Sequence, residues 1–205
     1  SYVGGDDKKL GEKVGYDVEM SIDSYNYLQY VNYYKGKNVE SEVSKPYSFR
    51  FFVPLIASLL PFDSFTSLNI INLSTEILGL IYLMKILSLI GFRQKTIFIT
   101  SLVYSFSFPV FYYGVVGLLD APAIFLIIMG IYYTFKKQIL PLAIIFIFGA
   151  MVNEKVILLL PFYFFFNYKE NGLKKSLTYS LMLFIFFAIT TFLVRKLTIN
   201  SDSTF

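Results

Sequence analysis

Residues Ile139 to Asn167 read ILPLAIIFIFGAMVNEKVILLLPFYFFFN, and they determine how the rest of the chain is placed relative to a membrane. The stretch is apolar over almost its whole length, but positions 153–155 are polar. One straight helix would run about 40 Å, which exceeds the ~30 Å hydrocarbon core of a bilayer, and would bury a carboxylate and an ammonium in lipid. We therefore predict two short helices from one membrane face, which meet over residues 149–153 and present Glu154 and Lys155 at the opposite face or in a wet cavity beneath it.

The composition is typical of an integral membrane protein. Hydrophobic residues make up 56% of the chain and charged residues only 16%, with a mean hydropathy of +0.60, whereas a soluble domain of this size exposes more charge. The net charge of +4 does not indicate nucleic-acid binding, because the basic residues stand in short groups between apolar stretches. The absence of cysteine and histidine excludes disulfides, thiolate and imidazole metal sites and a Ser-His-Asp triad.

Residues 1–50 form a polar segment that we expect to lie outside the membrane. Within it, residues 22–35 have helical spacing, with Asp23 at the expected N-cap and Tyr27 on a stripe of tyrosines. A tyrosine stripe suits the headgroup layer of a membrane, where the rings are buried and the hydroxyls stay hydrated. It can equally stack on a sugar.

The rest of the chain predicts an all-α fold. Residues 46–62 are apolar but too short to cross a membrane, so we expect an interfacial or re-entrant helix with Arg50 at its start. The fold class is a polytopic transmembrane helical bundle over residues 51–197, which lies between the polar outer segment and a polar tail at 198–205. Besides the helical pair, the expected spans cover residues 69–92, 96–113, 120–135 and 176–194.

Basic groups orient these spans. With a helical hairpin at 139–167, seven basic residues fall at the cytoplasmic ends and three outside, whereas one uninterrupted span gives six against three. The hairpin then places a set of charged residues on the outer side: Asp17, Asp23, Arg50, Asp120, Glu154 and Lys155.

Carboxylates near cations at a membrane surface suit the transfer of a group from a lipid-linked phosphate. A carboxylate can take the proton of an acceptor hydroxyl, while Lys or Arg stabilises the charge on the departing phosphate. The alternative is that these charges form caps and interfacial pairs; Asp120, just before a first-turn proline, suits an N-cap. Glu76 lies inside the first span, so it is either functional or paired with a neighbouring helix.

Three short pieces resemble the multi-pass GT-C glycosyltransferases, which use polyprenyl-phosphate-linked sugars. They are DSYNY at 23–27, PYSFR at 46–50 running into VPL at 53–55, and GLLD at 117–120 with NEK at 153–155. The family places a catalytic Asp in its first outer loop, followed by helices along the membrane and many spans. That loop normally follows a first transmembrane helix, which this chain lacks, so we expect the chain to be the N-terminal part of such an enzyme.

The resemblance implies roles for the outer residues. Asp23 would be the general base, with Asp17 as the alternative, and Asp120 and Glu154 would orient sugar hydroxyls or the base. Arg50 and Lys155 would hold the lipid phosphate, and Tyr27 would contribute to substrate binding. Some members use a divalent metal, but the sequence has no ligand cluster that supports one, and we expect no cofactor.

The expected partners are the lipid bilayer, a polyprenyl-phosphate-sugar donor and a glycan, lipid or protein acceptor. The expected location is a bacterial inner membrane, with the N-terminal segment outside. Two other functions remain open. One is a polysaccharide polymerase or ligase of the outer leaflet, which takes a preassembled oligosaccharide. The other is a transporter or structural membrane subunit, which Glu76 and the broken helices would favour.

Overall fold

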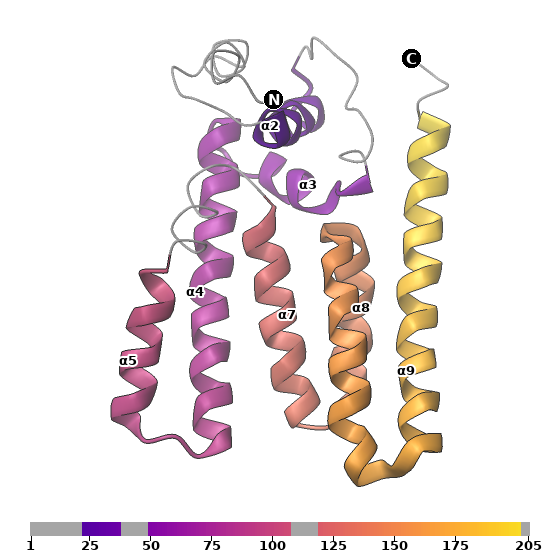
Figure 1. Cartoon of the computed structure of the whole chain (residues 1–205). Helices are drawn as coiled ribbons and strands as arrows, with labels where there is room; N and C mark the ends of the chain where they lie inside the picture. The colour runs from indigo at the N-terminus through magenta and orange to yellow at the C-terminus, as the bar shows by residue number, and fades with distance from the viewer. Residues whose placement is uncertain (1–21, 38–48, 108–118, 202–205) are drawn as a thin grey trace, which may run out of the picture.

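A computed structural model describes residues 22–37, 49–107 and 119–201, and within these ranges the regular structure is entirely helical. The all-α prediction is therefore confirmed for the part of the chain that the structure describes. Figure 1 shows the elements, which are α2 (Ile22–Tyr34), α3 (Phe52–Ser58), α4 (Ser64–Ile90), α5 (Gln94–Ser105), α7 (Asp120–Phe135), α8 (Ile139–Val152), the 3-10 helix η2 (Glu154–Leu158) and α9 (Leu159–Ser201).

The longer helices run side by side, and the short helices α2 and α3 lie across one end of them (Figure 1). We call this the capped end; Ser64, Asp120 and Glu154 begin their helices there. The opposite end, called the basic end, contains the α4–α5 turn at Arg93 and the α7–α8 turn at Lys137. The capped end is where the predicted site residues must meet if they form one site.

The ends of α4 show why this helix is well defined. Asp63 is the N-cap, and its carboxylate accepts a hydrogen bond of 3.0 Å from the Thr66 amide. The helix ends at Gly91, which has φ of +93° and lets the Phe92 amide bond back to the Leu87 carbonyl at 3.0 Å. A side chain at position 91 would strain this left-handed turn.

The predicted break within residues 139–167 is present. α8 ends at Val152, and Asn153 is extended, with φ of −166° and ψ of 132°. The Asn153 side chain accepts a hydrogen bond of 3.1 Å from the Lys155 amide and so caps the start of the following helix η2. Gly149 allows the two helices to meet closely, because a Cβ there would lie 2.5 Å from Val156.

A second reversal divides α9 into two legs. Gly172 has φ of +71° inside the element, so its first leg runs beside α8 toward the basic end and its second leg returns (Figure 1). The return is visible in a contact at the capped end, where the Arg195 guanidinium lies 5.3 Å from the centroid of the Phe49 ring. Phe187 of the second leg packs edge-on against Phe146 of α8 in the core, with ring centroids 6.2 Å apart.

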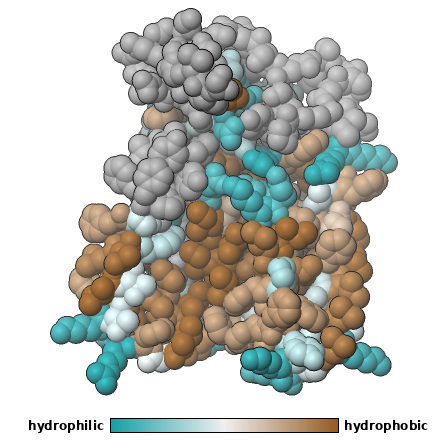
Figure 2. All heavy atoms as spheres, viewed as in Figure 1, coloured by the Kyte–Doolittle hydropathy of each residue, from teal (hydrophilic) through white to brown (hydrophobic). Residues whose placement is uncertain are grey.

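Two stretches of the described chain are long and apolar enough to cross a membrane, Ser64–Ile90 and Glu154–Leu197. The second is folded back at Gly172, so it supplies two legs rather than one long rod. α7 and α8 are apolar but shorter, at 16 and 14 residues. Figure 2 shows apolar residues over the middle of one face, with polar residues toward both ends.

The expected return span over residues 96–113 is described only in part. α5 ends at Ser105, and residues 108–118 lie outside the described ranges. With 12 residues, α5 is about 18 Å long at ~1.5 Å per residue, which is less than the ~30 Å of a bilayer core. α5 by itself therefore does not supply the predicted span.

Candidate functional site

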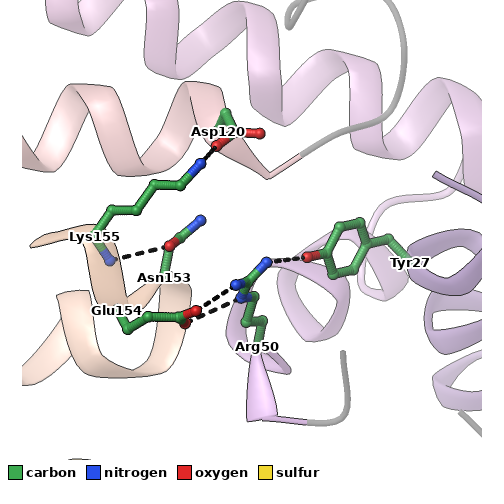
Figure 3. A network of polar contacts seen from close by, with 6 residues as sticks. All are labelled: Tyr27, Arg50, Asp120, Asn153, Glu154 and Lys155. Atoms are coloured by element: carbon green, nitrogen blue, oxygen red, sulfur yellow. Dashed lines mark hydrogen bonds and ion pairs between the residues drawn. The ribbon is translucent and has the colours of Figure 1, made fainter. Parts of the chain in front are cut away.

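Arg50 is the centre of a polar network at the capped end. It lies just before α3 and donates to both carboxylate oxygens of Glu154, from Nε to Oε2 at 3.2 Å and from Nη2 to Oε1 at 2.5 Å. Its Nη1 donates to the Tyr27 hydroxyl at 2.8 Å. Figure 3 shows the guanidinium between these two partners. The two-pronged geometry fixes the orientation of the Arg50 side chain.

Burial makes the Arg50–Tyr27 contact electrostatically significant. Tyr27 on α2 is only 2% exposed, and this burial raises the pKa of Tyr27 to about 12, although Arg50 acts in the opposite direction. Burial also acts to lower the pKa of Arg50, but the hydrogen bonds with Glu154 and Tyr27 outweigh it and hold the pKa above its usual range. The carboxylates of Asp23 and Asp120 add to the rise in the Tyr27 pKa, so both lie near the phenol.

Lys155 forms the second ion pair of the network. Its Nζ donates to Asp120 Oδ1 at 2.6 Å, and Lys155 is 59% exposed against 21% for Asp120. The alternative explanation of Asp120 as a helix cap is wrong: Leu119 is the N-cap of α7, and the helix has no side-chain capping hydrogen bond. Asp120 is the first helical residue, and its carboxylate is turned to the Lys155 ammonium instead (Figure 3).

The turn at Asn153 explains how two neighbouring residues reach different helices. After the extended Asn153, the tight η2 helix directs the Glu154 carboxylate to Arg50 beside α3. It directs the Lys155 ammonium to Asp120 at the start of α7. The break in the apolar stretch therefore joins three separate parts of the chain at one point (Figure 3).

A second set of contacts fastens the other end of α2. The Lys35 ammonium donates to the Leu60 carbonyl and the Ser67 hydroxyl, each at 3.2 Å, and also to the Phe62 carbonyl. The Ser64 hydroxyl donates to Asn32 Oδ1 at 2.5 Å. Burial lowers the pKa of Lys35. With Tyr27 held by Arg50, α2 is fixed at its middle as well as at its C-terminal end, where it lies against the start of α4.

The structure brings most of the predicted site residues together. Asp17 lies outside the described residues, and the other six gather at the capped end: Asp23, Tyr27, Arg50, Asp120, Glu154 and Lys155. Asp23 lies in the first turn of α2, which begins at Ile22, so its expected place at the N-cap is wrong. Nothing in the geometry tests the catalytic and binding roles, which stay predictions.

Two contributors were not predicted from the sequence. Asn153 accepts the hydrogen bond that starts η2, and an Asn before a helix is a recognisable capping signal. Lys35 fastens α2, but no local pattern indicates its distant carbonyl partners. Glu76 lies in α4, about 18 Å along the helix from Ser64 at ~1.5 Å per residue, and the structure does not join it to the network.

The described residues of the site contain no cluster of potential metal ligands. In the ranges that the structure describes, no group of three or more Asp, Glu, His or Cys side chains is placed to hold a metal ion. Comparison of the chain with known protein families, curated proteins and solved structures found no match. The site must therefore be interpreted from its own geometry.

Proposed function

We propose that this chain belongs to a multi-pass membrane glycosyltransferase of the GT-C type, which transfers a sugar from a polyprenyl-phosphate-linked donor to an acceptor. The observation that carries the proposal is the convergence of charge at the capped end. Arg50 and Lys155, each within hydrogen-bonding distance of a carboxylate, meet there beside a buried tyrosine, at one end of an apolar set of helices.

In the proposed site, the phosphate of the donor binds to Arg50 and Lys155. Each cation is held now by a carboxylate, and phosphate oxygens can take the same hydrogen bonds, since Arg binds both groups through the same planar fork. Glu154 and Lys155 are more than half exposed at their side chains, so a ligand can reach this pair of residues. Glu154 and Asp120 are then free to accept hydrogen bonds from sugar hydroxyls.

The proposed reaction needs one base and one stabilised leaving group. Asp23 takes the proton of the acceptor hydroxyl while the acceptor oxygen forms a bond to the anomeric carbon of the sugar. The bond from that carbon to the phosphate oxygen breaks, and its electron pair stays on the lipid phosphate. Arg50 and Lys155 stabilise the added negative charge. Tyr27 keeps the Arg50 guanidinium in place through their 2.8 Å hydrogen bond.

The arrangement also suits a lipid-linked substrate. The apolar middle of the helices (Figure 2) would face lipid, and the polyprenyl chain of the donor would lie there while its phosphate reaches the capped end. We place the capped end outside the cell, in a bacterial inner membrane, because basic turns collect at the other end. The acceptor is a glycan, a lipid or a protein.

The test is sugar transfer in membranes that contain the protein, supplied with a panel of radiolabelled polyprenyl-phosphate sugars. We expect the unchanged protein to transfer a single sugar, and Asp23→Asn to abolish transfer while membrane insertion is retained. Glu170→Gln at the basic end is the control, and its transfer should be normal. Normal transfer by the Asp23 variant would remove the assignment, and use of preassembled oligosaccharides alone would favour a polymerase or ligase.

One observation favours a transporter as the second candidate. Glu76 on α4 is partly buried, and its buried Oε1 has no hydrogen-bond partner among the described residues. An ionisable group at such a depth often takes part in ion or proton movement. A proton-coupled or ion-coupled flux that Glu76→Gln abolishes, together with indifference to Asp23→Asn, would favour this function over sugar transfer.

A further inference from the structure

The basic end contains a cluster of lysines and tyrosines that the proposed reaction does not use. Lys85 lies on α4, about 8 Å before the last residue Ile90 at ~1.5 Å per residue. Its ammonium lies 4.7 Å from the centroid of the Tyr82 ring. Among the described residues no carboxylate forms an ion pair with Lys85. Its charge is therefore available to an anionic ligand.

Helix α7 completes this cluster. The Tyr82 and Tyr133 hydroxyls are 3.3 Å apart across the α4–α7 contact, and the Tyr82 and Tyr132 rings meet edge-on with centroids 5.3 Å apart. The Lys136 ammonium lies 6.0 Å from the centroid of the Tyr132 ring, and it too has no carboxylate partner in the described ranges. We call Tyr82, Lys85, Tyr132, Tyr133 and Lys136 the Lys–Tyr cluster.

The surroundings of the cluster are strongly basic. The acidic residue of the neighbouring turns, Glu170, is already paired with Lys137 at 2.5 Å. The exposed basic side chains of this end come from the α4–α5 turn, the α7–α8 turn and the reversal of α9: Arg93, Lys95, Lys136, Lys137, Lys169, Lys174 and Lys175. Such an excess of positive charge attracts an anionic surface.

The side of the cluster nearer the middle of α4 is apolar. Leu78 and Ile81 are seven and four positions before Lys85, so they lie on the same face of the helix. Both side chains are more than 40% exposed. A ligand that is bound at the ammonium groups therefore meets an apolar helix face on one side and the basic turns on the other.

We propose that the Lys–Tyr cluster binds the headgroup of an anionic phospholipid, in the leaflet on the basic side of the membrane. The Lys85 and Lys136 ammonium groups neutralise the phosphate. Of the hydrogen-bonded Tyr82 and Tyr133 hydroxyls, the one that accepts from the other keeps its own proton and can donate it to a phosphate oxygen. The acyl chains lie along the exposed apolar face of α4. Basic groups between helices, on the side where basic residues collect, suit the headgroups of anionic lipids. This site is independent of the sugar-transfer proposal.

The test is lipid binding by the full chain in a mild detergent, measured as lipid adducts by native mass spectrometry. Phosphatidylglycerol should bind, and phosphatidylcholine should bind much more weakly. The double variant Lys85→Gln/Lys136→Gln should bind phosphatidylglycerol roughly 30-fold more weakly, from the usual contribution of two basic residues near an anionic surface. The matched control is Lys169→Gln/Lys174→Gln, which removes the same charge from the same end. These lysines lie on α9 rather than on α4 or α7, so they act on the headgroup only through screened, longer-range attraction, and the variant should lose much less binding than the cluster variant.

Two further variants separate the roles of the charges and of the tyrosine hydroxyl. Lys85→Arg/Lys136→Arg should retain binding, because the charges remain, and Tyr133→Phe should weaken it a few-fold, because the ring stays but the hydroxyl is lost. If the double Gln variant does not fold, the Tyr133 variant decides. Equal losses in the cluster and control variants would overturn the proposal and leave only general attraction. Equal binding of the two lipids would also overturn it, as would full competition by inorganic phosphate.

Discussion

Arg50 and Glu154 are 104 positions apart in the chain, yet the guanidinium of one donates two hydrogen bonds to the carboxylate of the other. The contact joins the segment before α3 to the break after α8. Next to it, Lys155 reaches Asp120 at the start of α7. The polar residues that interrupt the apolar stretch therefore hold the capped end together, whatever chemistry takes place there.

The coupling between Arg50 and Glu154 is measurable by a double-mutant cycle. We expect Arg50→Gln and Glu154→Gln to interact by about 1 kcal/mol in the free energy of unfolding, since Glu154 is 57% exposed and partly screened by solvent. Unfolding of the four proteins in a mild detergent gives this coupling. Strictly additive effects of the two changes would show that the ion pair contributes nothing.

The close approach at Gly149 predicts a second effect on stability. A Cβ at this position would lie 2.5 Å from Cγ1 and 2.8 Å from Cβ of Val156, and the latter belongs to the rigid base of a buried side chain. Gly149→Ala should therefore destabilise the protein by about 1–3 kcal/mol. Val156→Ala in the same chain should recover part of this loss. Melting temperatures of the two single variants and the double variant test the contact; an unchanged Gly149→Ala protein would refute it.

Tyr27 predicts how stability depends on alkaline pH. Its pKa is about 12 in the folded chain, against an ordinary value of 10.0, because burial disfavours the phenolate. The stabilisation from a raised pKa is fully present below pH 10 and is lost as the pH rises through 12. The loss amounts to about 2–3 kcal/mol. The free energy of unfolding, measured between pH 9 and 12, should therefore fall more steeply for the unchanged protein than for Tyr27→Phe. Parallel curves would contradict the assignment.

Lys35 predicts the mobility of α2. Lys35→Met removes the contacts to Leu60 and Ser67, so backbone amides of α2 should exchange with deuterium roughly tenfold faster. Lys37→Met is the control, because it removes the same charge two positions further on and should leave the exchange unchanged. Equal exchange in both variants would mean that Lys35 does not hold this helix.

The break of the apolar stretch could be predicted from the sequence because its cause is local. Two adjacent charges within a stretch of 29 mostly apolar residues are costly in lipid, so we expect the chain to turn near them, and it does so at Asn153. This single turn also predicted which charged residues lie together at the capped end of the helices. The all-helical fold could also be predicted, because it follows from the length and composition of the apolar stretches.

The pairing of the charges could not be predicted, because it depends on how the helices pack. Asp120 has the local features of a helix cap, but the Lys155 ammonium lies 2.6 Å away and takes its carboxylate. In the same way, nothing near Lys35 in the sequence indicates the carbonyl that it meets 25 positions later. Local patterns predict which residues lie at an end of the bundle, whereas tertiary contacts decide which of them are partners.

The sidedness of residue 154 tests the account most directly. Single cysteines introduced as Asp120→Cys, Glu154→Cys and Asn171→Cys can be labelled from outside intact cells with a membrane-impermeant maleimide, since the chain has no cysteine of its own. Permeabilised cells serve as the control, in which all three should react. We expect positions 120 and 154 to react in intact cells and position 171 to stay unlabelled. Labelling of position 171 with position 154 protected, or of 120 and 154 from opposite sides, would contradict the proposed site.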